Sequence, residues 1–359
     1  MLQEVLDSNY LAPVGPMLDR LEAAMCERLG FRHALALNSA TAAIELTIRH
    51  LIDVRHDRRD PRPPLVLASS LTFIASVAPA ARLGCEIRLI DAEEDSWTLD
   101  PILLAAALRD AQAEGRPVLA VIPTDLYGQA CDLQAIRGLC DPLGIPVLCD
   151  AAESLGVVSD LPKAWASVTS FNGNKIITCS GGGMLASDDA ALIAHARKLS
   201  MQAREAAAHY EHRELGYNFR LSNLLAAVVL AQLGVLDERV RQKRALFDAY
   251  QSRLGDLPGL SFMPEAGWNS CTRWLTVIRL REEACGLRPE DLRLALEAAD
   301  IESRPVWKPL HQQPVFQGIR TYGGGVSDAI FREGLCLPSG TAMNDADIDR
   351  VCAIIRSLF

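Results

Sequence analysis

Lysine is scarce in this chain of 359 residues, and a surplus of basic charge is missing altogether. Only five of the 36 basic residues are lysines, and the net charge is −9 with a pI near 5.4. Nucleic acids and anionic membrane surfaces are bound through clustered positive charge. We therefore expect neither as a partner, and a small-molecule ligand is the better expectation. The five lysines are Lys163, Lys175, Lys198, Lys243 and Lys308.

Long apolar runs and closely spaced cysteines are also absent. No stretch of about 18 uninterrupted apolar residues occurs, and the first 15 residues have no basic leader. The ten cysteines include no C-x-x-C pair, which indicates reduced, buried thiols rather than zinc ligands or disulfides. His209 and His212 lack a third strong ligand nearby, so "HYEH" is interpreted as a solvated loop. We expect a cytoplasmic protein without a metal site.

Short apolar runs alternate with helical periodicity between residue 16 and about residue 190. The segment from Pro16 to Gly30 predicts a helix, because proline suits a first helical turn and glycine a helix end. The alternation argues for βαβ units around a mostly parallel sheet. The runs that predict strands are residues 65–69, 86–91, 117–123, 145–150 and 166–171.

The pattern changes after residue 220. Residues 221–254 form a single long helical pattern that is apolar nearly all round at first, so we expect its first part to be buried. Beyond Gly255, a strand at 272–280, a helix at 288–300 and a closing helix after Asn344 predict a smaller α+β domain.

Two segments place polar residues where α/β proteins bind ligands. In "LALNSATAAIELTIRHL" (35–51) we expect a strand that leads into a helix. The small residues at the start of the helix leave its first amide groups open to an anion. The alternative is that they form an ordinary N-cap with no ligand. Asp150 ends the apolar run "VLCD", at the carboxyl end of a strand where α/β sheets bind ligands. A buried carboxylate needs a partner such as a protonated pyridine nitrogen. Asp150 would otherwise cap the next helix.

Lys175 stands in a third segment, "SFNGNKIITCSGGGML" (170–185), between a strand and a glycine-rich turn. A lysine that forms a Schiff base must be partly desolvated, so that its amine is neutral for part of the time. Ser170 and Asn174 can hydrogen-bond an anion, whereas the simpler interpretation is an exposed turn lysine. An anion site, a carboxylate and an amine together fit one cofactor, pyridoxal phosphate.

Motifs along nearly the whole chain resemble the DegT/DnrJ/EryC1/StrS family of sugar aminotransferases. They are "NSATAAIEL", "SSLTFIASVAPAARLG", "YGQACDL", "DAAESLG", "SFNGNKIITCSGGGML", "LGYNFRLSNLLAAVVLAQL", "RPVWKPLHQQPVF" and "GLCLPSG". The resemblance implies an α/β, fold-type-I, pyridoxal-phosphate-dependent homodimer with shared active sites. It implies a large cofactor-binding domain at 13–240 with a mostly parallel sheet, a small α+β domain at 241–359, and residues 1–12 near the active site.

The resemblance also implies roles for individual residues. Lys175 matches the catalytic Schiff-base lysine, and Asp150 the carboxylate on the pyridine nitrogen. Ala40 and Thr41 match a Gly-Thr pair that holds the cofactor phosphate, and Ser170 matches a strand serine on the same phosphate.

Further matches surround the cofactor and the substrate. Phe73 matches the ring that stacks on the pyridine, and Glu153 occupies the position near the cofactor's 3-hydroxyl, where many relatives carry Gln or His. Asn218 matches the residue that reaches the phosphate of the partner subunit's cofactor. The substrate mouth is expected at Trp307, Lys308 and His311. A packing role in the small domain is the alternative for that last segment.

The expected activity is amino transfer from an amino acid, with glutamate as the implied donor, to a nucleotide-linked keto sugar. The stretches "SNYLAPVGP", "NGNKIIT" and "WKPLHQQPVF" look most like the branch that aminates C4 of UDP-4-keto-6-deoxy-N-acetylhexosamines. A C3 aminotransferase, or one acting on a dTDP-sugar, stays open, as does a non-catalytic regulator with the same fold. A family dehydratase would carry histidine in place of Lys175.

Overall fold

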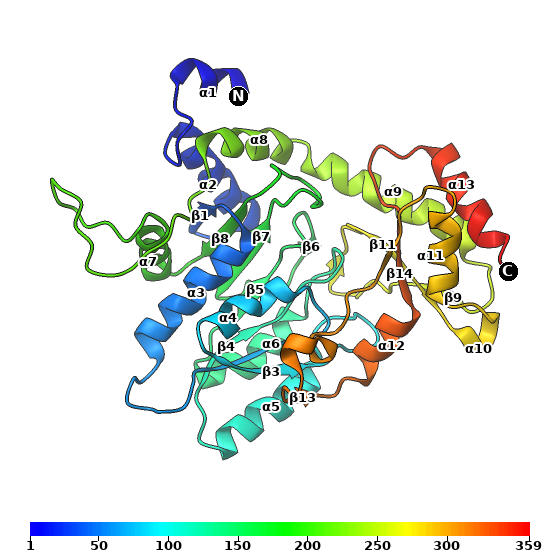
Figure 1. The fold of residues 1–359 in the computed structure, drawn as a ribbon, viewed down its shortest axis with the longest axis horizontal. Helices are drawn as coiled ribbons and strands as arrows, with labels where there is room; N and C mark the ends of the chain where they lie inside the picture. The colour runs from blue at the N-terminus through cyan, green and yellow to red at the C-terminus, as the bar shows by residue number, and fades with distance from the viewer.

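The computed structural model describes residues 1–359, and a mixed β-sheet runs through its larger part (Figure 1). Its strands are β1 (His33–Leu37), β2 (Leu65–Ser69), β3 (Glu86–Ile90), β4 (Val118–Ile122), β5 (Leu148–Asp150), β7 (Ala166–Ser170), β8 (Gly183–Ser187) and β13 (Thr321–Tyr322). The strand orders β1-β8-β7-β5 and β4-β2-β3-β13 are joined by parallel bridges from Val121 to Val147 and from Thr124 to Asp150. Only β8 runs antiparallel to its neighbours, so the predicted mostly parallel sheet is confirmed.

Helices cover both faces of this sheet, which is why its strands read as continuous apolar runs rather than alternating ones. Successive strand residues pack to opposite sides: Leu35 and Leu37 join the core beneath α3, and Ala34 joins the core beneath α2. The helices are α2 (Pro16–Leu29), α3 (Ala40–Arg55), α4 (Ala78–Arg82), α5 (Pro101–Ala113), α6 (Leu133–Cys140), α7 (Ala190–Ser200) and α8 (Asn223–Leu233).

The C-terminal part forms the predicted α+β arrangement. An antiparallel sheet in the order β12-β14-β11-β9 packs against three helices around a separate apolar core. Its main elements are α9 (Leu236–Leu254), β9 (Leu260–Phe262), β11 (Thr276–Leu280), α11 (Pro289–Glu297), β12 (Arg304–Pro305), β14 (Gly334–Leu337) and α13 (Asp345–Arg356). The shorter ones are α1 (Leu2–Ser8), β6 (Val158–Ser159), β10 (Asn269–Ser270), α10 (Glu282–Cys285) and α12 (Gly325–Glu333).

The single helix predicted over residues 221–254 is wrong, because the chain breaks it into α8 and α9 at Gly234 and Val235. At the break, Gln232 turns to the loop that carries Lys175, where its side chain both donates to and accepts from the backbone of Thr178. In the backbone, the Val235 N–H donates to the Gln232 carbonyl three residues earlier, which ends the regular α-helical bonding at Gly234. The apolar side chains of α8 are also less buried than expected. Five remain partly exposed in the single chain: Leu224, Leu225, Val228, Leu230 and Leu233.

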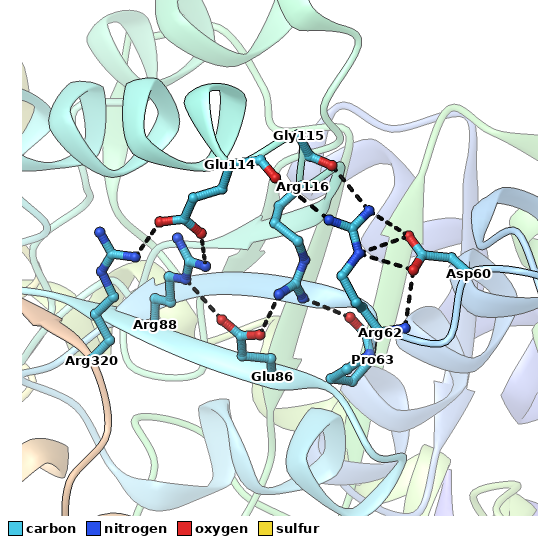
Figure 2. A network of polar contacts seen from close by, with 9 residues as sticks. All are labelled: Asp60, Arg62, Pro63, Glu86, Arg88, Glu114, Gly115, Arg116 and Arg320. Atoms are coloured by element: carbon cyan, nitrogen blue, oxygen red, sulfur yellow. Dashed lines mark hydrogen bonds and ion pairs between the residues drawn. The ribbon is translucent and has the colours of Figure 1, made fainter.

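The C-terminal chain returns to the large sheet through β13, which pairs with β3. An arginine network of alternating charges fastens this edge; it comprises Asp60, Arg62, Glu86, Arg88, Glu114, Arg116 and Arg320 (Figure 2). Arg88 is buried and lies 2.9 Å from Glu86 and 2.5 Å from Glu114. Arg320, one residue before β13, also pairs with Glu114. The network therefore anchors Arg320 and β13, at the C-terminal end of the segment that runs from Trp307 to Tyr322.

None of the helices combines the length and the apolar character that crossing a membrane requires. All ten cysteines are free, and all but Cys26 and Cys285 are buried.

Candidate active site

A cavity of about 300 Å³ lies at the carboxyl ends of β5 and β7, the edge at which open α/β sheets bind ligands. Asp150 ends β5 and Ser170 ends β7, while the start of α3 and the loop at Gly181 and Gly182 close the other side. Its polar lining comprises Asn38, Ser39, Thr41, Thr72, Ser76, Thr124, Asp150, Glu153, Ser170, Asn172, Asn174 and Lys175. Distant parts of the sequence therefore converge as the three motifs suggested.

Lys175 is the only lysine in this lining, and its side chain is 12% exposed. It lies in the turn after β7, where its backbone N–H donates to the carbonyl of Asn172. The Nζ atom lies 4.1 Å from the centre of the Trp274 ring and 3.5 Å from a Glu153 carboxylate oxygen. The exposed turn lysine considered for the sequence is therefore wrong: the side chain turns inward and is partly desolvated.

Asp150 is 4% exposed and faces the same cavity. Its Oδ2 accepts a hydrogen bond from the Ser76 hydroxyl at 2.6 Å, and its Oδ1 accepts one from the Ala152 N–H at 3.1 Å. Burial raises the pKa of this carboxyl, while the Ser76 hydrogen bond and the Lys175 charge act in the opposite direction. A cationic group entering the cavity would therefore find a carboxylate that is held in place but lacks a close counter-ion.

Glu153 is a second buried carboxyl beside Lys175. Its Oε2 accepts from the Tyr127 N–H at 2.8 Å, and its Oε1 accepts from the Trp307 indole N–H at 3.2 Å. Burial raises the pKa of Glu153, and Lys175 acts to lower it. Glu153 thus connects the lysine to the segment at the expected substrate mouth.

The start of α3 offers free backbone donors to an anion. Ser39 caps the helix through the Ala42 N–H, while the N–H groups of Ala40 and Thr41 have no partner within the protein. Gly183 packs against this turn so closely that a Cβ there would lie 2.3 Å from the Ala40 nitrogen. With the helix dipole behind them, these amides suit a phosphate group. Asn38, Ser39 and Ser170 line the same part of the cavity.

Aromatic rings form one wall and the rim. Phe73 is 52% exposed and lies 5.4 Å from the Trp307 ring, centre to centre. Tyr127 is stacked between Trp307 and Trp274, and its hydroxyl accepts from the Trp307 backbone N–H at 2.8 Å. Of these rings Phe73 and Trp307 line the cavity, so a flat ligand entering past Phe73 would meet the ring of Trp307, a residue whose backbone is held by the Tyr127 hydroxyl.

The other predicted residues lie farther out. Lys308 is exposed and is not part of the cavity lining. His311 bridges Ser70 at 2.6 Å and Asp328 at 2.8 Å, so both ring nitrogens are engaged. Asn218 is exposed in the single chain, and its carbonyl accepts from the Asn38 side chain at 3.2 Å.

Sequence reasoning missed two residues that shape the site. Ser76 holds Asp150 across 74 positions, and Trp274 covers Lys175 across 99. Trp274 also donates its indole N–H to the Asn174 carbonyl at 2.9 Å and so fastens the lysine turn. No local pattern marks either residue, because each acts only through the folding of distant segments.

A groove of about 1060 Å³ adjoins the cavity and shares Asn174 and Trp307 with it. The groove runs along the C-terminal sheet past Arg304, Ser339 and Arg350. The groove also contains Asp300, Glu302 and Asp347, so its lining carries charges of both signs. It is larger than the cavity, so a ligand with a long polar extension has room beyond Trp307.

The cavity residues fit pyridoxal phosphate. The free amides of α3 suit its phosphate, the buried Asp150 lacks the close cation that a protonated ring nitrogen supplies, and Lys175 is the one amine available to its aldehyde. The residues that suit the phosphate, the ring nitrogen and the aldehyde are all observed in this chain, so this fit does not depend on similarity to other proteins.

Comparisons with known proteins agree with this geometry. The sequence profile of the DegT/DnrJ/EryC1/StrS aminotransferase family matches residues 1–356. The chain is 43% identical over 366 residues to EpsN of Bacillus subtilis (strain 168), named a pyridoxal phosphate-dependent aminotransferase, with 100% of this chain and 92% of EpsN covered. It is 30% identical over 364 residues to the GDP-perosamine synthase of Vibrio cholerae, covering 100% and 95% of the two chains. The crystal structure of DesI with its TDP-sugar product matches with a TM-score of 0.88 at 26% identity, covering 99% of this chain and 88% of that chain.

Proposed function

The chain belongs to the DegT/DnrJ/EryC1/StrS aminotransferase family and is a pyridoxal-phosphate-dependent nucleotide-sugar aminotransferase, and on this premise we propose the residues and the substrate. Lys175 is the catalytic lysine, and L-glutamate donates the amino group. The acceptor is a UDP-4-keto-6-deoxy-N-acetylhexosamine. The observation that carries the proposal is the convergence of Lys175, Asp150 and the open α3 amides on one cavity.

Each group in the cavity has one task in binding the cofactor. The Ala40 and Thr41 amides, with Ser170, bind the phosphate, and Asp150 pairs with the protonated ring nitrogen. Phe73 packs against the ring face at the rim. Asn218 acts on the phosphate in the partner subunit's site.

The bound cofactor supplies an electron sink for the negative charge that develops when a carbon–hydrogen bond is broken. The protein supplies the proton transfers. In its neutral form the Lys175 amine accepts a proton from the α-carbon of the donor, and as an ammonium group it later returns a proton. The Trp274 ring and the aromatic wall keep bulk water away from this amine. Amino transfer to the sugar reverses the same sequence.

The proposed acceptor rests on two supports. The segments "SNYLAPVGP" and "RPVWKPLHQQPVF" resemble the sugar-facing parts of the C4-aminating branch. The groove beyond Trp307 has room for a nucleotide, and two arginines line it beside three acidic residues. Arg304 is paired with Glu302, and the Arg350 guanidinium donates to the Ala299 carbonyl. Arginine binds diphosphate through charge-assisted hydrogen bonds, which are among the stronger ones. A dTDP- or GDP-linked keto sugar is the second candidate, because two of the similar proteins are named for TDP- and GDP-sugars.

Substitution of Lys175 tests the central assignment. Lys175→Ala should abolish the visible absorbance of the lysine-bound cofactor and lower the rate of amino transfer by about 10²–10⁴-fold or more. Lys163→Ala is the matched control, because Lys163 pairs with Asp188 on the surface. A cofactor adduct that borohydride can still trap on another lysine of the Lys175→Ala protein would sink the assignment.

The substrate is tested by comparing kcat/KM for 4-keto and 3-keto UDP-sugars, with dTDP- and GDP-linked 4-keto sugars as further acceptors and glutamate as donor. We expect the UDP-linked 4-keto N-acetyl sugar to be preferred. Preference for a 3-keto isomer or for another nucleotide would overturn the proposed acceptor, yet it would leave the roles of Lys175 and Asp150 intact.

We also propose that the working unit is a homodimer with shared active sites. The partly exposed apolar side chains of α8 require more cover than one chain gives them, and a second copy would supply it. Subunits of the inactive variants Lys175→Ala and Asn218→Asp should partly restore activity when mixed, because one hybrid site would be intact. Mixing that restores nothing, while both variants remain dimeric, would contradict shared sites.

A further inference from the structure

The resemblance places Glu153 near the cofactor's 3-hydroxyl, and its contacts in the structure point to a second task at Lys175. Glu153 is 5% exposed, and its two oxygens face three donors: the Tyr127 N–H, the Trp307 indole N–H and the Lys175 ammonium group. No acceptor is hydrogen-bonded to the carboxyl. Burial raises the pKa of Glu153, whereas the three donors act in the opposite direction. The geometry suits the ionised carboxylate, because a protonated carboxyl would present its own O–H to one of these donors.

We propose that Glu153 is a further catalytic group, the counter-ion that stabilises the positive charge which Lys175 acquires while it carries a proton. The inference rests on the proposed role of Lys175. When Lys175 takes a proton from the donor carbon, a C–H bond breaks and an N–H bond forms at Nζ. The carbon keeps the electron pair, and the positive charge appears 3.5 Å from the Glu153 oxygen.

Two charges within about 4 Å attract strongly where water is excluded, so Glu153 lowers the free energy of the protonated lysine relative to the neutral one. The carboxylate cannot swing away, because Tyr127 and Trp307 each hold one of its oxygens. The Trp307 N–H binds the same oxygen, Oε1, that faces Lys175. The residue at the groove entrance thus fixes the counter-ion.

The other charged and titratable groups nearby are less suited to this task. Asp150 also acts on the Lys175 charge, but its two oxygens are engaged by Ser76 and Ala152, and its proposed partner is the cofactor ring. The Tyr127 hydroxyl is bound by the Trp307 backbone, and burial raises its pKa well above the usual value. Cys336 lies near Tyr127 and Glu153, and burial raises the pKa of its thiol to about 12, so it stays neutral.

The scarcity of lysine makes a direct test practical. Lysine labelled with ¹³C at the ε-carbon gives only five signals in an NMR titration of the full chain after the cofactor is removed. The signal missing from Lys175→Ala identifies Lys175. In Glu153→Gln we expect the Lys175 titration midpoint to fall by about one pKa unit or more, a tenfold change in proton affinity. Gln is nearly isosteric, so the variant removes the charge with little change in volume.

Two further variants separate charge from packing. Trp307→Phe removes one of the two donors that hold the carboxylate but keeps the Glu153 charge, so the Lys175 midpoint should fall clearly less than in Glu153→Gln. Glu290→Gln is the matched control, because Glu290 pairs with Arg293 on α11, in the C-terminal part of the chain. This substitution should leave the Lys175 titration midpoint unchanged. The Lys243 signal reports folding, since burial lowers the pKa of that lysine to about 8 and unfolding would restore a normal value.

An unchanged Lys175 midpoint in a folded Glu153→Gln protein would overturn the proposal. An equal fall in Trp307→Phe would also overturn it, because the effect would then come from packing. This titration needs neither sugar nor donor, so its result is separate from that of the proposed function. If Lys175→Ala kept a trapped cofactor adduct on another lysine, the proposed function would fail, whereas the measured coupling between Glu153 and Lys175 would stand.

Discussion

In the arginine network Glu86 and Glu114 each face two guanidinium groups, whereas in the active-site cavity Asp150 and Glu153 share a single lysine. The first cluster fastens the edge of the sheet where β13 joins β3 (Figure 2). The second lies at the carboxyl ends of the strands. Both clusters belong to the same sheet, yet basic groups surround each glutamate in the network, whereas acidic groups outnumber the single lysine in the cavity.

The difference also appears in the pKa values. Hydrogen bonds from Arg88 and Arg320 lower the pKa of Glu114 to about 2, whereas burial raises the pKa of Asp150 and of Glu153. Paired charges contribute to the fold and are satisfied within it. In the cavity two desolvated carboxyls share one amine, and Asp150 has no close counter-ion, which indicates a place that a ligand completes. The comparison separates charges that hold the structure from charges that await a cofactor.

Exchanging each kind of carboxyl for its amide should give the largest contrast. Asp150→Asn should lower kcat/KM by about 10²–10³-fold, because the ring nitrogen loses the carboxylate that keeps it protonated. Glu114→Gln should keep activity within about twofold but reduce thermal stability. The measurements are steady-state kinetics and thermal melts of both holoenzymes. A large loss of activity in Glu114→Gln would erase the distinction between the two clusters.

Cutting the network at its buried centre should affect stability rather than chemistry. Arg88→Met removes the side chain that links Glu86 to Glu114, and we expect the free energy of unfolding to fall by about 1.5–3 kcal/mol. The loss is limited because the Arg88 Nη1 atom has no partner to begin with. Urea denaturation measures the free energy of unfolding. Arg59→Met is the control, because the Arg59 side chain is 91% exposed. Equal stability of the two variants would contradict a structural role for the network.

The raised pKa of Asp150 predicts a smaller, pH-dependent effect on the cofactor-free protein. A carboxyl whose pKa is higher in the folded than in the unfolded state contributes its full stability below the unfolded value of about 3.9, and this is lost as the pH rises through the folded value. Asparagine does not titrate. Cofactor-free Asp150→Asn should therefore melt at a higher temperature than the wild type where the wild-type carboxyl is ionised, with a gap that narrows as the pH falls through the folded pKa of Asp150. A gap that widens on acidification would contradict the sign of this shift.

The smallest effect is expected at Lys308, which the sequence grouped with its neighbour Trp307. Trp307 lines both the cavity and the groove, whereas Lys308 is exposed and lines neither. Because an exposed charge is well solvated, Lys308→Ala should change the KM for the sugar by less than about threefold with kcat unchanged. A tenfold rise in KM would show that Lys308 binds the substrate after all.

Local signals carried much of the prediction of the fold. The strand predicted at 65–69 coincides with β2, and the helix predicted from Pro16 ends at Leu29 with Gly30 as its left-handed cap, as expected. Proline, glycine and apolar runs act within a few residues, so the sequence alone reveals them. The strand predicted at 272–280 begins only at Thr276, where its pairing with β14 starts, whereas the Thr272 N–H bonds the Gly128 carbonyl in the larger part of the structure. The helix predicted over 221–254 is two helices.

The sequence by itself determined the α/β class and the family, and it predicted Lys175 and Asp150 as site residues, because strand ends and residue types are properties of short stretches of chain. Only the tertiary structure decided what surrounds them. Ser76 reaches Asp150, Trp274 covers Lys175, and Glu153 joins Lys175 to Trp307 across 154 positions. These contacts depend on strand order and on the return of the C-terminal segment to the large sheet. Burial and charge balance are properties of the assembled neighbourhood, and no single stretch of the chain contains them.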